Sequence, residues 1–80
     1  DNIKCFPNPA HEKLTISIGE NTPDLTVILY SIYGEKLLES SSESNEITLS
    51  TENLPSGIYL VQLSTSVMDG APVCFKIYKE

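Results

Sequence analysis

The sequence has no arginine and no tryptophan, and it contains one histidine. Five lysines stand against eleven acidic residues, which gives a formal net charge of −6 at pH 7. Because nucleic-acid phosphates and anionic membrane surfaces repel an acidic protein, nucleic acid is not expected as a partner. No run approaches the roughly 18–20 consecutive apolar residues of a membrane-spanning helix, so direct membrane insertion is not expected either.

Residues that carry catalytic or metal chemistry are also scarce. A metal site needs three or four convergent ligands, and His11 is accompanied only by dispersed carboxylates. His11 follows a proline-containing turn beside Glu12 and Lys13, where a solvated imidazole is the simplest interpretation. The four glycines are isolated from one another, so there is no glycine-rich phosphate loop. We therefore expect no catalytic residue, no metal ligand, no cofactor and no enzyme.

The length of 80 residues sets the limit of one small domain, because a chain of this size buries only about 60–65% of its extended surface. The sequence starts at Asp1 without an initiator methionine or a signal-peptide core. We expect residues 1–80 to be a single domain excised from a larger secreted protein.

The two cysteines, Cys5 and Cys74, lie near opposite ends of the sequence. Their separation excludes a local Cys-x-x-Cys redox or metal pair. One interpretation is a disulfide between the first and last strands, which in an oxidising compartment could add roughly 4 kcal/mol in the chain-entropy model. The other is a pair of small apolar side chains in the core, because free cysteine is commonly buried.

The hydrophobic pattern is typical of β-strands, with apolar and polar residues alternating at the period of two. The runs 14–18, 25–32, 36–40, 46–50, 58–65 and 73–79 are expected to be strands, and the continuous apolar character of 25–32 favours the centre of a sheet. Gly34 can adopt positive φ, which predicts a hairpin between 25–32 and 36–40. The serine-rich segment 40–45 is expected to be a solvated loop, and 67–70 the last turn.

About seven short strands at spacings of 8–12 residues, with turn signals between them and no helical period, predict an all-β fold. The expected architecture is an antiparallel β-sandwich of immunoglobulin-like topology. The Cys…Trp…Cys hallmark of antibody domains is absent, because there is no tryptophan.

Two proline-containing segments indicate shape and recognition instead of chemistry. The segment Pro7, Asn8 and Pro9 is stiff, because each proline fixes its own φ and restricts the residue before it. We expect it to hold the first strand at a corner. The segment 54–57, Leu-Pro-Ser-Gly, has the form of a turn that delivers the chain into the strand 58–65. Taken alone, each segment is an ordinary corner of a sandwich.

Taken together and in this order, the motifs resemble the C-terminal sorting domain of cargo proteins exported by the type IX secretion system of Gram-negative bacteria. The resemblance covers residues 6–80 and includes a Tyr-Pro-Asn-Pro-like opening, a Leu-Pro-x-Gly-x-Tyr segment and a basic closing strand. The chain departs from the pattern at Phe6, where tyrosine is commoner, at its two cysteines, and at Glu80, where lysine is usual.

The resemblance implies a folded, cleavable signal and not a catalyst. Its implied partners are the outer-membrane translocon and shuttle proteins, together with a sortase-like cysteine protease that cuts upstream of the domain. The implied route leads through the periplasm to the cell surface or the medium. The residues expected to carry recognition are Leu54, Pro55, Gly57, Tyr59, Lys76, Ile77 and Lys79. The lysines could instead guard an exposed edge strand, which would also be the place for a homodimer.

A different class of function stays open at this point. An immunoglobulin-like or fibronectin-like accessory module that binds protein or carbohydrate, or that spaces larger domains, would have the same fold. Carbohydrate binding usually uses exposed aromatic side chains, for which Tyr30, Tyr33 and Tyr78 are the candidates. An enzyme is a distant third, because no set of residues suggests a reaction.

Overall fold

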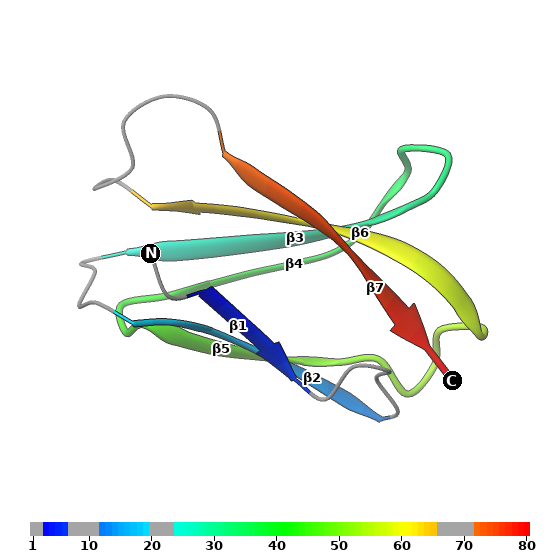
Figure 1. The fold of residues 1–80 in the computed structure, drawn as a ribbon, viewed down its shortest axis with the longest axis horizontal. Coiled ribbons are helices and arrows are strands. Elements are labelled where there is room, and N and C mark those ends of the chain that lie inside the picture. Colours follow the sequence, from blue (N-terminus) through cyan, green and yellow to red (C-terminus); the bar gives the residue numbers. More distant parts are fainter. Residues whose placement is uncertain (1–2, 7–11, 20–23, 66–71) are drawn as a thin grey trace.

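The computed structural model describes residues 3–6, 12–19, 24–65 and 72–80, and these form an all-β chain (Figure 1). The strands are β1 (Ile3–Phe6), β2 (Lys13–Ile18), β3 (Leu25–Ser31), β4 (Lys36–Ser42), β5 (Glu46–Ser50), β6 (Gly57–Thr65) and β7 (Val73–Lys79). Within the described ranges there is no helix that is long and apolar enough to cross a membrane. The expected proline corner at 7–9, His11 and the turn at 67–70 lie outside the described residues.

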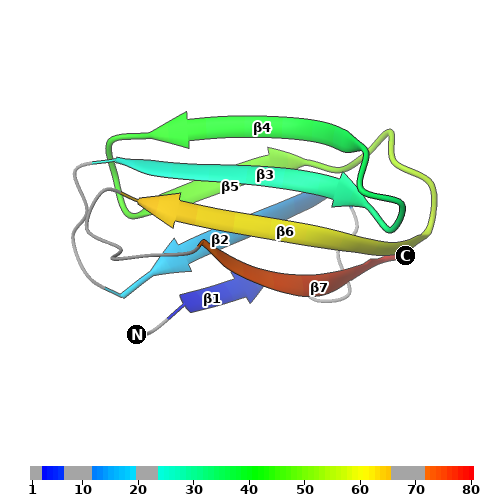
Figure 2. The ribbon, with the colours of Figure 1, turned by 90° about the horizontal axis from the view of Figure 1, so that it is seen from above.

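The strands form two antiparallel sheets that lie one above the other (Figures 1 and 2). One sheet has the order β1-β2-β5, and the other has the order β4-β3-β6-β7. In the lettering used for immunoglobulin-like sandwiches, these sheets correspond to A-B-E and C′-C-F-G. The expected immunoglobulin-like sandwich is confirmed, and β3 lies between β4 and β6 as its apolar run predicts.

The core lies between the two sheets and is built from every second residue of the inner strands. Side chains alternate across a strand, so every second position of β2, β3 and β6 points toward the opposite sheet, and the buried residues at these positions are apolar. Burying each such side chain is worth about 1.5–3 kcal/mol relative to leaving it exposed. The buried apolar residues are Leu14, Ile16, Ile18, Leu25, Val27, Leu29, Ile47, Leu49, Tyr59, Val61, Leu63 and Ile77.

The hairpin between β3 and β4 has the geometry of a tight turn followed by a bulge. The amide of Gly34 donates to the carbonyl of Ser31 at 3.0 Å, and the amide of Ser31 donates to the carbonyl of Glu35 at 2.9 Å. Gly34 has φ +89°, the conformation that lets a type I turn of this kind join two twisted strands. The predicted role of Gly34 is confirmed.

The serine-rich segment is more ordered than the sequence predicts. Strand β4 continues through Ser42, because Ser41 pairs with Thr26 and Ser42 with Leu25. The turn into β5 is held by the Ser44 amide, which donates to the Ser42 hydroxyl at 3.0 Å. The expectation of a loop over 40–45 is therefore wrong for its first half, since pairing with β3 overrides the low hydrophobicity of the serines.

Candidate recognition site

The segment between β5 and β6 carries the chain from one sheet to the other. Its first residue, Thr51, is fully buried, and the Thr51 amide donates to the carbonyl of Glu12 at 2.8 Å. The amide of Leu54 donates back to the carbonyl of Thr51 at 3.1 Å, which closes a turn. Gly57 ends the corner with φ +151°, in backbone space that glycine occupies more readily than other residues. Residues 54–57 are called the corner below.

Tyr59 forms a hydrogen bond to the corner from β6, the strand that follows the corner in the sequence. The ring is buried, and its hydroxyl donates to the carbonyl of Pro55 at 2.5 Å. A tyrosine near the start of strand F that bonds back to the backbone a few residues upstream is the tyrosine corner of immunoglobulin-like domains. The tyrosine of the Leu-Pro-x-Gly-x-Tyr motif thus has an architectural role.

Lys79 forms a second hydrogen bond to the corner, from β7. The side chain is half-buried at the end of β7, and its ammonium group donates to the carbonyl of Leu54 at 3.1 Å. Figure 1 shows why the two can meet: β7 ends beside the connection that leads into β6. Adjacent carbonyls, those of Leu54 and Pro55, therefore accept hydrogen bonds from side chains on two strands.

The rest of β7 presents a buried and an exposed side. Ile77 lies opposite Tyr59 and is 1% exposed, whereas Lys76 lies opposite Leu60 and is exposed. Lys76 forms no salt bridge within the part of the chain that the structure describes. The two lysines that the sequence groups together therefore have different environments, one exposed to solvent and one hydrogen-bonded to the corner.

Apolar side chains gather on the outer face of the four-stranded sheet, on the side away from the core. Tyr30 lies opposite Leu60 on the neighbouring strand, so the two form a cross-strand pair. Lys36 and Lys76 flank this pair in one row across the sheet, about 14 Å apart if the strands are spaced by about 4.8 Å. We call this surface the apolar face; its apolar members are Ile28, Tyr30, Ile58, Leu60 and Tyr78.

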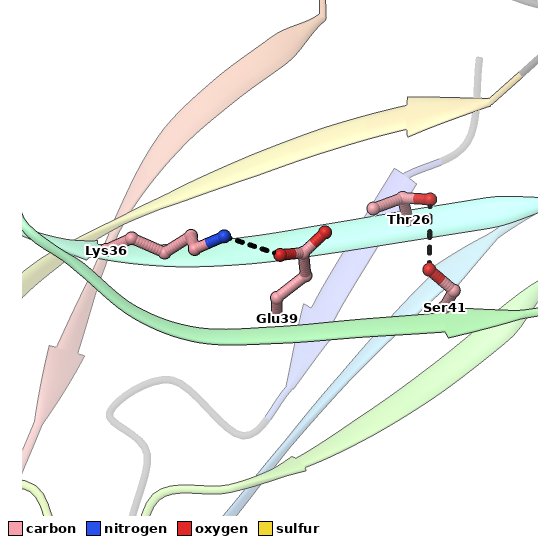
Figure 3. A network of polar contacts seen from close by, with 4 residues as sticks. All are labelled: Thr26, Lys36, Glu39 and Ser41. Carbon is pink, nitrogen blue, oxygen red and sulfur yellow. Dashed lines mark hydrogen bonds and ion pairs between the residues drawn. The ribbon is translucent and has the colours of Figure 1, made fainter.

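The β3–β4 margin of the apolar face is polar. The Lys36 ammonium lies 2.7 Å from the Glu39 carboxylate, and the hydroxyls of Thr26 and Ser41 lie 3.2 Å apart; Figure 3 shows both contacts. The Glu39 carboxylate raises the pKa of Lys36; the hydrogen bond between them is the larger cause, and the negative charge of the carboxylate is the next. Because Lys36 is already paired, Lys76 is the cation on the apolar face that has no salt bridge among the described residues.

The outer face of the three-stranded sheet has a different character. Outward positions of β2 and β5 are occupied by threonine, serine, lysine and glutamate, and the hydroxyls of Thr15 and Thr48 lie 3.0 Å apart across the two strands. Phe6 is the large apolar side chain exposed there, at 47%. Among the described residues, the outer face of the three-stranded sheet is thus polar apart from Phe6, and that of the four-stranded sheet has a cluster of apolar side chains next to polar ones.

The two cysteines are free thiols, with Cys5 half-buried and Cys74 exposed. They lie on β1 and β7, edge strands of different sheets, and no Cα atom of β1 is within 8 Å of one of β7. A disulfide needs Cα atoms about 4.4–6.8 Å apart. Of the two interpretations of the cysteines, the bridge is the one that the structure does not contain, and burial holds for Cys5 alone.

The expected recognition residues lie in the corner, at Tyr59 on β6 and on β7, and Tyr59 links the other two places because it bonds to Pro55 and lies opposite Ile77. The bond from Lys79 to Leu54 was missed by the sequence reasoning, because the two residues are 25 positions apart and nothing local marks them as partners. No group of three or more His, Cys, Asp or Glu side chains suited to a metal ion occurs within residues 3–6, 12–19, 24–65 and 72–80.

Comparison with known proteins identifies the family of the chain. Residues 4–69 match the family described as the secretion system C-terminal sorting domain. The chain is also similar to an endo-acting ulvan lyase of Formosa agariphila, with 30% identity over 64 residues. That alignment covers 79% of this chain and 12% of the lyase, so the chain spans about an eighth of the length of this relative.

Proposed function

The chain belongs to the family of secretion system C-terminal sorting domains, and from this premise we propose that the export machinery reads it as a folded address through its corner, β7 and the apolar face. As a member of that family, the chain is a C-terminal sorting signal of type IX secretion. Such a signal implies export of the attached cargo to the cell surface or the medium.

The proposal includes specific partners and a sequence of events. Shuttle proteins and the outer-membrane translocon bind the domain after the cargo has entered the periplasm. A sortase-like cysteine protease then cuts upstream of the domain, which acts as substrate. The cargo would be a larger protein that carries residues 1–80 as one domain at its C-terminus. The chain covers 12% of the lyase, which supports a cargo that is larger than this domain.

The observation that carries the proposal is the contrast between the two outer faces. A contiguous apolar surface on a small domain typically marks an interaction site. Lys76 lies beside Leu60 on that surface and forms no salt bridge within the described residues, so a carboxylate on the partner would find a free cation there. The partner surface that fits is therefore apolar with an acidic group.

The proposed residue roles differ with burial. Lys76 and Pro55 are exposed and can touch a partner directly. Tyr59 and Ile77 are buried, so their part in recognition is to hold the corner and β7 in place. Leu54, Gly57 and Lys79 are half-buried between these two groups.

The first experiment fuses residues 1–80 to the C-terminus of a periplasmic reporter in a cell that has this secretion system. We expect the reporter at the surface or in the medium, and we expect retention in the periplasm when residues 76–80 are removed. A reporter that is retained with the intact domain, or exported equally well without residues 76–80, would contradict the proposal.

The second experiment tests the apolar face with a matched pair of charge reversals. Lys76→Glu repels an acidic partner, and we expect export to fall at least tenfold, the effect of losing about 1.4 kcal/mol of binding. Lys13→Glu is the control, because Lys13 is also an exposed strand lysine but lies on the other sheet. Equal export of the two variants, with circular dichroism showing both folded, would remove the apolar face from the proposal.

The same reporter distinguishes the accessory-module alternative. An adhesive or spacer module of identical fold would bind or separate domains but would not carry a reporter across the outer membrane. Export of the fusion therefore separates the two functions without reference to the fold.

A further inference from the structure

We infer that Lys79 is a positioning residue that makes the shape of the corner depend on the docking of β7. The inference rests on the proposed function only in taking the corner as a surface that the export machinery reads. It concerns how that surface is assembled: the corner is held in one geometry when β7 is paired with β6 and is released when β7 is not.

Few backbone hydrogen bonds hold the corner in place. Pro55 has no amide hydrogen to donate, and Pro55 and Ser56 are exposed. The backbone bond from Leu54 to Thr51 anchors its first residue. Beyond that point, the carbonyls of Leu54 and Pro55 are fixed by the side chains of Lys79 and Tyr59.

The hydrogen bonds from Tyr59 and from Lys79 form at different stages of folding. Tyr59 lies four residues from Pro55, so its bond can close as soon as β6 leaves the corner. Lys79 lies 25 residues from Leu54, and its ammonium reaches the carbonyl only when β7 is in register on β6. That register sets Lys79 opposite Gly57 and Ile77 opposite Tyr59.

The geometry of the corner therefore depends on whether β7 is paired with β6. The strand β7 is an edge strand with one fully buried side chain, Ile77, so it can separate from the four-stranded sheet at a lower cost than the inner strands β3 and β6. A partner that binds the corner in its fastened geometry thereby selects molecules in which β7 has docked. Two segments that are distant in sequence are then read as one unit, and an incompletely folded domain is not presented.

The test measures amide hydrogen exchange by NMR in the 80-residue chain, comparing Lys79→Met with Lys76→Met. Methionine keeps the unbranched stem and removes the donor, and both variants lose the same charge from the same strand. For Lys79→Met we expect exchange of the Leu54 amide to accelerate about tenfold, the factor expected for loss of a charged hydrogen bond. Exchange of the Ile16 amide in the other sheet should stay unchanged, and Lys76→Met should leave both amides as in the wild type.

Two further variants separate positioning from general stability. Lys79→Arg retains a donor and should restore slow exchange at Leu54. Ile77→Val loosens β7 without touching the corner, and it should accelerate exchange at Leu54 more than at Ile16. If Lys79→Met and Lys76→Met show the same exchange at Leu54, or if Ile77→Val affects both amides equally, the inference is wrong.

Export of the reporter fusion then tests the selection step. We expect Lys79→Met to reduce export and Lys79→Arg to restore it. If the wild-type domain is exported and Lys79→Met is exported equally well despite a loosened corner, the selection by β7 docking is refuted while the sorting function stands. If the wild-type domain itself is not exported, the proposed function fails, and the exchange data still decide whether Lys79 fastens the corner.

Discussion

At the scale of single residues, the position of one polar atom decides what a side chain does. Tyr59 and Tyr33 are chemically identical, yet the first is buried with its hydroxyl on the Pro55 carbonyl and the second is 90% exposed. Lys79 and Lys76 differ in the same way. The residue type alone does not distinguish the members of each pair, but only the less exposed one, Tyr59 or Lys79, has a side chain that bonds to the corner.

The first prediction concerns the hydroxyl of Tyr59. Tyr59→Phe keeps the buried ring and removes the donor, so we expect the free energy of unfolding to fall by about 1 kcal/mol, the usual net value of one hydrogen bond. Urea denaturation measures this change, and Tyr33→Phe, at an exposed ring, should leave the midpoint unchanged. Equal midpoints for the two variants would show that the tyrosine corner adds nothing to stability.

The second prediction concerns the two thiols. Burial raises the pKa of Cys5 from its ordinary value of 9.0 to about 11, whereas Cys74 is exposed. Because the thiolate is the reactive form, iodoacetamide at pH 8 should alkylate Cys74 much faster than Cys5 in the folded protein. Mass spectrometry of peptides from a timed reaction checks the order. Equal rates in the folded state, or faster labelling of Cys5, would contradict the described burial.

The same pKa shift gives a pH dependence of known sign. Between about pH 9 and pH 11 the Cys5 thiol ionises in the unfolded chain but stays protonated in the folded one. The unfolded state then binds fewer protons, so stability falls as the pH rises through that window and is unaffected below it. Cys5→Ala should remove this part of the dependence, whereas Cys74→Ala should leave it in place.

At the scale of elements, turns are determined by the residues within them, whereas the extent of an edge strand is determined by its pairing with the neighbouring strand. The hairpin after β3 follows from Gly34, whose φ of +89° few other residues adopt. Ser31 supports the turn, since its hydroxyl accepts hydrogen bonds from the amides of Tyr33 and Glu35 at 3.2 Å each. Asn45 links the next turn to β2 through its side-chain amide, which donates to the Ile18 carbonyl at 2.9 Å.

The third prediction tests the backbone of that hairpin. Nothing lies within 4 Å of a Cβ atom added at Gly34, so a substitution there meets conformational strain without steric contact. Gly34→Ala should lower the free energy of unfolding by about 1–2 kcal/mol, and Gly34→Asn should cost less because asparagine tolerates positive φ. The two urea midpoints decide it: an alanine variant as stable as the asparagine variant would contradict the assigned turn.

The pattern of apolar residues, alternating in some strands and nearly continuous in others, predicted β2, β3, β5, β6 and β7 to within two residues, since burial of one or both faces of a strand imposes it on the sequence. Three features were not predictable. The serines at the end of β4 carry no apolar signal and pair because β3 lies beside them. The separation of Cys5 from Cys74 depends on which edge each sheet offers. The bond from Lys79 to Leu54 depends on register between distant segments.

At the scale of the whole molecule, the two sheets depend on each other. Ile16 and Ile77 are almost fully buried, the first in the three-stranded sheet and the second in the four-stranded one. Both belong to a single apolar cluster, so neither sheet keeps its buried face covered when the other is lost. For a chain of this length the total stability is about 4–12 kcal/mol, which leaves little for a sheet that unfolds separately.

The fourth prediction follows from this dependence. Ile16→Val and Ile77→Val each remove one buried methylene group and should each lower the free energy of unfolding by about 0.5–1.5 kcal/mol. Ile32→Val, at a side chain that is 56% exposed, is the control and should have little effect. Because the core is shared, each variant should shift one cooperative transition, with tyrosine absorbance and circular dichroism coincident along the urea curve. Two separate transitions, or a shift seen by only one of the two probes, would mean that the sheets unfold independently and that the corner between them is a hinge.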